Sequence, residues 1–130
     1  MIVLDASAVL EVLLRSPTAA IVEECIFDSE QTLHAPHLID VEVTQVLSRY
    51  AASGESGPER CRAALDDLAD LPITRYPHDL LLPRAWELRH NLTAYDAVYV
   101  ALAEALEAPL LTCDQRLKRA SGHRAKVDVV

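Results

Sequence analysis

The sequence predicts an α/β sandwich with a central, mostly parallel sheet of four to five strands. Short aliphatic and β-branched runs alternate with longer helical stretches along the whole chain. Two of these runs, Met1–Leu4 and Pro109–Thr112, lead directly into a helical stretch, which is apolar after the first of them. The composition, 51% hydrophobic with only 3 Gly, argues against disorder. Together these observations favour strands connected by helical crossovers.

The same alternation of short apolar runs and helical stretches predicts each strand and helix along the chain. The five predicted strands cover residues 1–5, 32–36, 72–76, 109–112 and 126–130. The predicted helices cover residues 6–14, 17–28, 36–53, 57–71, 77–91, 94–107 and 113–120. The Ala52–Pro58 segment contains Gly, Ser and Pro, and we expect it to be a turn between two helices rather than a linker between domains.

The length and the cysteines limit the architecture and the compartment. A chain of 130 residues can bury one sizeable core, so we expect a single domain covering residues 1–130. Cys25, Cys61 and Cys113 are odd in number and lack CxxC spacing, which favours reduced thiols. No stretch approaches the ~20 apolar residues of a membrane span, and no basic leader precedes the first strand. We therefore expect a cytoplasmic protein.

The charge is unevenly distributed. The net charge is −8, yet the last fifteen residues carry five basic side chains and one acidic side chain. The strongly acidic remainder does not favour general affinity for nucleic acids, which depends on Lys and Arg. It would attract a basic protein partner. We interpret the basic tail as a solvated helix face rather than a phosphate-binding surface.

Four acidic residues are the candidates for a functional site: Asp5, Glu42, Asp96 and Asp114. Asp5 lies at the carboxyl end of the first predicted strand, and Asp114 lies just beyond the fourth. Since the carboxyl ends of parallel strands form the ligand crevice of such sheets, these two acids are candidates for one site. If all four meet, they form a negative hollow that divalent cations could neutralise. Asp5 could equally cap the helix that follows it.

Two of the other acids also have structural explanations. Thr93 and Asp96 fit a capping box, with Thr93 as the N-cap and Asp96 three residues later. Thr112 and Gln115 fit a second capping box, which would leave Asp114 without that capping role. A carboxylate in the first turn of a helix also gains from the helix dipole. The residues alone leave these alternatives open.

Glu42 differs because it lies inside the predicted helix 36–53. Ile39 and Val46 flank it at helical spacing, so Glu42 borders the apolar face. Asp40 borders the same face on its other side, and periodicity does not choose between the two acids. For either one, the simpler explanation is a boundary residue whose carboxylate reaches water.

Four segments in a fixed order form a specific combination, although each is weak alone. They are Ile2-Val-Leu-Asp5-Ala-Ser7-Ala, Glu42-Val-Thr-Gln-Val-Leu47, Thr93-Ala-Tyr-Asp96-Ala-Val-Tyr-Val-Ala-Leu-Ala103 and Leu110-Leu-Thr-Cys-Asp114-Gln-Arg-Leu117. With these segments the chain resembles the PIN domain and, within it, the VapC-type toxins of VapBC toxin–antitoxin modules. The resemblance spans essentially the whole chain and implies a PIN-like α/β/α sandwich.

The resemblance also implies roles for individual residues. The residues implied to bind metal and to carry catalysis are Asp5, Glu42, Asp96 and Asp114. This implication chooses Glu42 over Asp40. Supporting roles are implied for the hydroxyls of Ser7 and Thr112. Gln45 departs from the family, which often has Asn at that position, so a supporting contact from its amide does not carry over.

The activity that the resemblance implies is endonucleolytic hydrolysis of RNA by metal-activated water, leaving a 5′-phosphate on one product. Mg²⁺ is the implied cofactor, with Mn²⁺ as a substitute and one or two ions per site. Carboxylate oxygens suit this hard cation, and two ions would lie ~3.5–4 Å apart. The implied partners are the RNA substrate, a VapB-type antitoxin and a second copy of the chain in a homodimer.

Two alternatives from other classes stay open. A catalytically silent PIN-like binding scaffold would have lost acids, whereas all four are present. A receiver-like signalling module also has an acidic pocket and needs a late Lys, which Lys126 could supply. Its phospho-acceptor Asp should end a central strand, but after the predicted strand 72–76 no Asp occurs before Asp79.

Overall fold

Five parallel strands form the central sheet of the computed structural model, which describes residues 1–130. They are β1 (Ile2–Leu4), β2 (Leu33–Pro36), β3 (Ile73–Tyr76), β4 (Leu110–Thr112) and β5 (Val127–Val129). Every neighbouring pair in the sheet is parallel. The predicted α/β fold is confirmed, and each predicted strand agrees with an observed one to within one residue at either end.

The strand order places a switch point between β1 and β4. The order across the sheet is β3-β2-β1-β4-β5. The chain therefore adds β2 and β3 on one side of β1, and then β4 and β5 on the other side. Ligands of open α/β sheets bind beyond the carboxyl ends of the strands at such a point. A receiver-like module has the order 2-1-3-4-5. The observed order therefore excludes that alternative.

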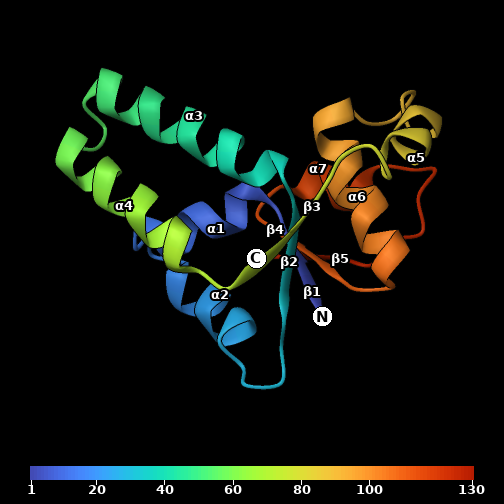
Figure 1. Ribbon diagram of the computed structural model, residues 1–130, viewed down its shortest axis with the longest axis horizontal. Coiled ribbons are helices and arrows are strands. Elements are labelled where there is room, and N and C mark those ends of the chain that lie inside the picture. Colours follow the sequence, from blue (N-terminus) through green and yellow to red (C-terminus); the bar gives the residue numbers. More distant parts are fainter.

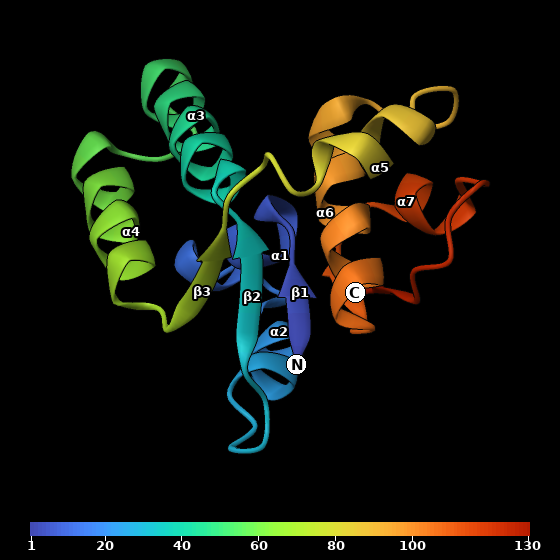
Figure 2. The same ribbon diagram turned by 45° about the vertical axis from the view of Figure 1, so that its right-hand side comes forward.

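Seven helices surround the sheet (Figure 1). They are α1 (Ala6–Leu13), α2 (Ala19–Ile26), α3 (Leu38–Ser53), α4 (Pro58–Asp70), α5 (Leu82–Glu87), α6 (Ala94–Leu106) and α7 (Gln115–Arg119). Helices α3 and α4 lie side by side and project as an arm, while α5, α6 and α7 gather on the opposite side (Figure 2). The arm and the α6 side therefore flank the carboxyl ends of the strands.

Helix α6 is deeply buried. Residues 97–103 are all buried, and the helix packs against β1, β2, β4 and α5. The apolar sequence of this stretch explains the burial, because a helix that is hydrophobic on nearly all sides has no solvent face to offer. The Thr93 hydroxyl starts the helix by accepting a hydrogen bond from the Asp96 N–H at 3.2 Å. The predicted capping role of Thr93 is confirmed.

The turn between α3 and α4 confirms the predicted connector. Gly54 ends α3 with a φ of +79°, a left-handed conformation that glycine adopts without a steric cost. Pro58 begins α4, where its missing N–H costs nothing. Helix α4 can therefore fold back along α3, and α3 is held with one face on the core.

The helix predicted over residues 77–91 is wrong in extent, because only Leu82–Glu87 is helical. The preceding residues form a turn in which the His78 carbonyl accepts from the Leu82 N–H at 3.1 Å. The His78 ring accepts from the backbone N–H of Leu38, the first residue of α3, at 2.8 Å. Pro83 lies in the first turn of the short helix, which is typical of a helix start.

The other predicted helices agree with the observed bounds to within two residues at either end. No helix combines the length and the apolar character that crossing a membrane requires.

Candidate active site at the carboxyl edge of the sheet

Asp5 and Asp114 follow neighbouring strands at the switch point. Asp5 comes directly after β1, and its N–H donates to the Leu111 carbonyl of β4 at 3.3 Å. Asp114 comes two residues after the end of β4. The parallel register therefore brings the two ends of the chain together, as the sequence predicted for this pair.

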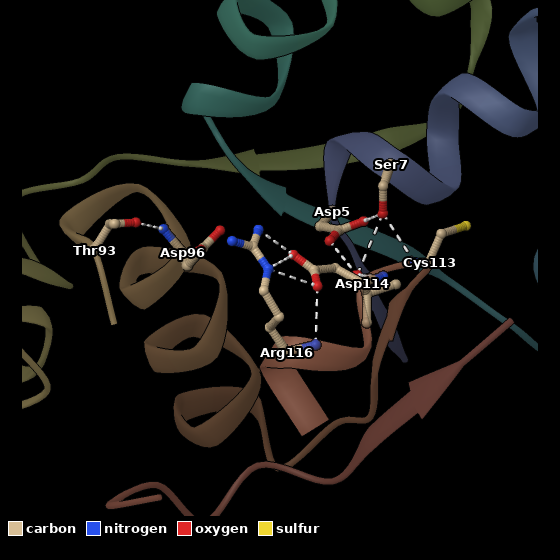
Figure 3. A network of polar contacts seen from close by, with 8 residues as sticks. Asp5, Ser7, Thr93, Asp96, Cys113, Asp114 and Arg116 are labelled. Atoms are coloured by element: carbon tan, nitrogen blue, oxygen red, sulfur yellow. Dashed lines mark hydrogen bonds and ion pairs between the residues drawn. The ribbon is translucent and has the colours of Figure 1, made fainter. Parts of the chain in front are cut away.

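Asp5 is buried and fully engaged by hydrogen bonds (Figure 3). Its Oδ1 accepts from the Ser7 hydroxyl at 2.6 Å and from the Ala8 N–H at 3.1 Å. Its Oδ2 accepts from the Thr112 hydroxyl at 2.5 Å. Asp5 therefore caps α1, as the structural alternative proposed, and it also takes part in a polar network that reaches β4.

The same two hydroxyls also bind the turn after β4. The Ser7 oxygen accepts from the Cys113 N–H at 2.9 Å, and the Thr112 oxygen accepts from the Asp114 N–H at 3.0 Å. Each hydroxyl thus donates to Asp5 and accepts from a backbone amide of the turn that carries Asp114. The turns after β1 and β4 are held together by this pair of hydroxyls.

Glu42 reaches the site from α3, whereas Asp40 does not. The Glu42 carboxylate accepts a hydrogen bond from the Tyr99 hydroxyl of α6 at 2.6 Å. Asp40 points elsewhere and forms two short bonds with the Arg75 guanidinium, at 2.7 and 2.9 Å. The structure thereby separates two acids that helical periodicity could not.

Tyr99 is a member of the site that the sequence reading missed. Its ring is 2% exposed and its hydroxyl reaches Glu42. In the sequence Tyr99 lies among aliphatic residues, which favours a place in the core. The available signal was the spacing: Tyr99 lies three residues after Asp96, so both face the same side of α6.

Asp114 takes the capping role that the sequence reading assigned to Thr112 and Gln115, so that prediction is wrong. Asp114 is the N-cap of α7, and its Oδ1 accepts from the Arg116 N–H at 2.9 Å. Thr112 instead belongs to the Asp5 network, since its hydroxyl lies at the end of a buried strand rather than at a helix start. The Arg116 guanidinium completes the arrangement by pairing with Asp114 at 2.6 Å.

The four carboxylates influence one another electrostatically. Burial raises the pKa of Asp5, Glu42 and Asp96 above the ordinary values of these acids. The negative charge of Asp96 raises the pKa of both Asp5 and Glu42 further, and Asp114 raises the pKa of Asp96. Hydrogen bonds oppose these effects without cancelling them. Each of the four acids therefore lies near enough to at least one of the others for their negative charges to repel.

Asp114 is the exception among the four. The hydrogen bond from the Arg116 side chain lowers the pKa of Asp114. Arg116 also lowers the pKa of Asp96, although burial and Asp114 outweigh it. The site therefore holds three carboxylates whose negative charge is poorly compensated and one that an arginine neutralises.

The donors suit a hard divalent cation, although the side chains are not arranged as a finished chelate. Carboxylate and hydroxyl oxygens are the ligands that Mg²⁺ prefers. No three Asp, Glu, His or Cys side chains stand in positions that would enclose an ion. The oxygens of Asp5 accept from three donors, and Asp114 pairs with Arg116. A cation bound by this set would compete with these contacts.

A cavity of about 410 Å³ adjoins Glu42 between α1 and α3. Ser7 and Glu42 line it, together with Gln45 and Arg49 one and two turns further along α3. Apolar side chains from both helices complete the wall. Gln45, which departs from the family pattern, thus faces the same space as Glu42 but forms no hydrogen bond with it.

Comparison with known proteins gives one consistent result. Residues 2–123 match the model of the family described as the PIN domain. Ribonuclease VapC1 of Mycobacterium tuberculosis strain H37Rv is 46% identical over 129 residues, which cover 98% of this chain and 96% of that protein. Ribonuclease VapC9 of the same strain is 44% identical over 130 residues, which cover 100% of this chain and 98% of that protein.

Solved structures show the same fold at lower identity. PAE2754 from Pyrobaculum aerophilum superposes with a TM-score of 0.72 at 24% identity and covers 99% of this chain and 83% of that chain. VapBC2 from Rickettsia felis, bound to a DNA fragment from its promoter, gives a TM-score of 0.73 at 16% identity. The match covers 99% of this chain and 98% of that chain. At these identities the likeness concerns the fold alone.

Proposed function

The chain belongs to the PIN domain family and, within it, to the VapC group, and from this premise we propose that it is a metal-dependent endoribonuclease that acts as the toxin of a toxin–antitoxin module. One observation carries the proposal. Four acids from separate segments lie near the switch point of the sheet, and partial or full burial together with neighbouring negative charge raises the pKa of three of them. Such a cluster favours cation binding.

The proposed metal ligands are Asp5, Glu42, Asp96 and Asp114, with Mg²⁺ or Mn²⁺ as the ion. When bound, a divalent cation supplies Lewis acidity to a phosphodiester and lowers the pKa of water. The residues around the ligands fix their positions. Ser7 and Thr112 hold Asp5 from two sides, and Tyr99 holds Glu42. We place these three hydroxyls in supporting roles.

The proposed substrate is RNA, and the structure narrows the choice of its phosphate contacts. Arg84 is occupied by Glu104 and Glu87, and Arg89 stacks over the Trp86 ring at 4.3 Å. Arg49 is exposed, has no ion-pair partner and lines the cavity beside Glu42. We therefore propose Arg49 as a phosphate contact next to the acids.

The proposed protein partner is a VapB-type antitoxin with basic side chains. The acidic body of the chain favours such a partner, because the net charge is −8 even with the basic tail included. A homodimer is also proposed. Leu82 and Trp86 lie four residues apart on α5, are 52% and 68% exposed, and offer apolar surface for it. Light scattering on the purified protein tests the dimer.

We further propose that residues 1–130 act as one PIN domain and that the protein works in the cytoplasm. The single sheet and its continuous buried core support the first statement, and the free thiols of all three cysteines are consistent with a reducing compartment.

The decisive experiment compares RNA cleavage by the wild type, Asp96→Asn and Asp40→Asn in EDTA, Mg²⁺ and Mn²⁺. Asp40→Asn is the matched control, because it removes an acid of α3 that pairs with Arg75 instead of reaching the site. We expect cleavage by the wild type and the control with metal only, and a loss of at least about a hundredfold in Asp96→Asn. Cleavage that survives both chelation and Asp96→Asn would indicate a contaminating nuclease.

Growth on expression separates the toxin from a silent binding scaffold. We expect arrest with the wild type and with Asp40→Asn, and normal growth with Asp96→Asn at equal protein level. A scaffold that acts only by binding would arrest growth regardless of the Asp96 substitution. The presence of all four acids favours the catalytic alternative.

A further inference from the structure

Arg116 makes an unusually complete set of contacts with Asp114. The guanidinium Nη2 lies 2.6 Å from Oδ2, and Nε lies 3.1 Å from each carboxylate oxygen. The Arg116 backbone N–H donates to Oδ1 as well, at 2.9 Å. Both oxygens of Asp114 are therefore taken by one residue, which lies two positions later in the chain.

The guanidinium also lies where it can offset a second acid. Figure 3 shows it between the Asp114 carboxylate and the Asp96 side chain. The charges act on each other, since Asp96 and Arg116 shift each other's pKa toward the charged forms. The other cations of α7, Lys118 and Arg119, form no ion pair with any acid of the site. Arg116 is thus the one basic side chain of this helix that faces the carboxylates.

We propose that Arg116 is an internal counter-cation of the acidic site, which a divalent cation must displace from Asp114 in order to bind there. The inference rests on the proposed metal-dependent function and names a residue of this chain that opposes metal loading. Asp114 can offer both of its oxygens fully to an ion only after the contacts with Arg116 are released.

The displacement is energetically accessible. The Arg116 side chain is 83% exposed and that of Asp114 is 25% exposed, so the pair is well hydrated. Exposed ion pairs contribute little to stability, because water and salt screen them. The Asp114 carboxylate can therefore exchange the arginine for a cation, and the freed guanidinium can extend into solvent without leaving a buried charge.

The test is the affinity for Mn²⁺, measured by isothermal titration calorimetry on the wild type, Arg116→Ala and Lys118→Ala. Lys118→Ala is the matched control, because it removes the same charge from the same helix. We expect Arg116→Ala to bind Mn²⁺ about two- to fivefold more tightly than the wild type, and Lys118→Ala to stay close to the wild type. Circular dichroism checks that each variant is folded.

A second pair of variants separates displacement from a general charge effect. In an Asp114→Asn background, the Arg116→Ala substitution should no longer improve Mn²⁺ binding, because the pair that it breaks is already lost. Equal affinities for Arg116→Ala and Lys118→Ala, or weaker binding by Arg116→Ala, would overturn this inference and leave the ribonuclease proposal intact. Absence of Mn²⁺ binding in the wild type and in Arg116→Ala alike would overturn the metal dependence together with the inference.

Discussion

The Thr112 hydroxyl joins Asp5 to the opposite end of the chain: it donates to Asp5 Oδ2 from 107 residues away in the sequence and accepts from the Asp114 N–H. Thr112 is completely buried. One hydroxyl therefore satisfies a buried carboxylate and a backbone amide together, at the point where β1 and β4 end. The separation between Asp5 and the turn that carries Asp114 depends on it.

Thr112→Val tests this link, because valine keeps the shape and removes the hydroxyl. We expect it to lower the free energy of unfolding by about 1–3 kcal/mol, since both partners of the hydroxyl lose a hydrogen bond in a buried environment. Thr112→Ser is the control, which retains the hydroxyl and loses one methyl group. Urea denaturation measures both, and equal stability of the two variants would contradict the role assigned to the hydroxyl.

Tyr99→Phe tests whether the Tyr99 hydroxyl positions Glu42. The substitution removes the 2.6 Å hydrogen bond and leaves the buried ring in place. Groups that orient metal ligands typically change affinity or activity by about 10–100-fold when they are removed. We expect RNA cleavage to fall by about tenfold, together with weaker Mn²⁺ binding. Tyr50→Phe, on α3 beside the cavity that Glu42 also lines, is the control. Unchanged metal affinity in Tyr99→Phe would refute the positioning role.

Most of the fold could be predicted from the sequence, because the relevant signals are local. Apolar runs of three to five residues marked the strands, and Thr93 and Gly54 marked where helices begin and end. The joint position of Asp5 and Asp114 followed from one rule about parallel sheets. The overlong helix at 77–91 shows the limit of this approach, since His78 bonds with the distant Leu38 rather than with a helical neighbour.

The parts of the site that could not be predicted depend on contacts between distant segments. Helical periodicity placed both Asp40 and Glu42 at the border of the apolar face. Only their partners distinguish them, because Asp40 pairs with Arg75 and Glu42 accepts from Tyr99. The pairing of Asp114 with Arg116 is close in sequence, yet it depends on which side chain caps α7. The sequence predicted a cap from Thr112 and Gln115, but the Thr112 hydroxyl is engaged by Asp5 at the end of β4 and Asp114 caps α7.

Glu42→Gln tests the electrostatic cost of the cluster through pH. Because burial raises the pKa of Glu42, its ionised form is disfavoured in the folded state. The cost is absent below the ordinary pKa of the acid and grows as pH rises through the raised value, so the metal-free protein should lose stability over that range. Glutamine can still accept from Tyr99 and carries no charge. We expect Glu42→Gln to melt a few degrees above the wild type at pH 7.5 in EDTA, and by clearly less at pH 4.5, near the ordinary pKa of the acid.

The control for this pH effect is Asp40→Asn, which removes an acid that Arg75 already neutralises. We expect it to melt at or slightly below the wild type at pH 7.5, because an ion pair is lost. A Glu42→Gln variant that melts lower than the wild type at pH 7.5 in EDTA would contradict the repulsion among the acids.

Divalent cations should stabilise the fold, and Asp5→Asn should remove most of the effect. Four acids that repel in the metal-free protein gain a shared counter-charge when the ion binds, and a ligand present at about 100 times its Kd adds about 2.7 kcal/mol to the free energy of unfolding. For a domain of this size, that corresponds to a rise of several degrees in Tm. Asn at position 5 can keep hydrogen bonds with Ser7 and Thr112 while losing the charge. Thermal melts in MgCl₂ or MnCl₂, against NaCl of equal ionic strength, measure the rise. Because Asp40→Asn should retain the full rise, an equal response from Asp5→Asn would place the cation outside the acidic site.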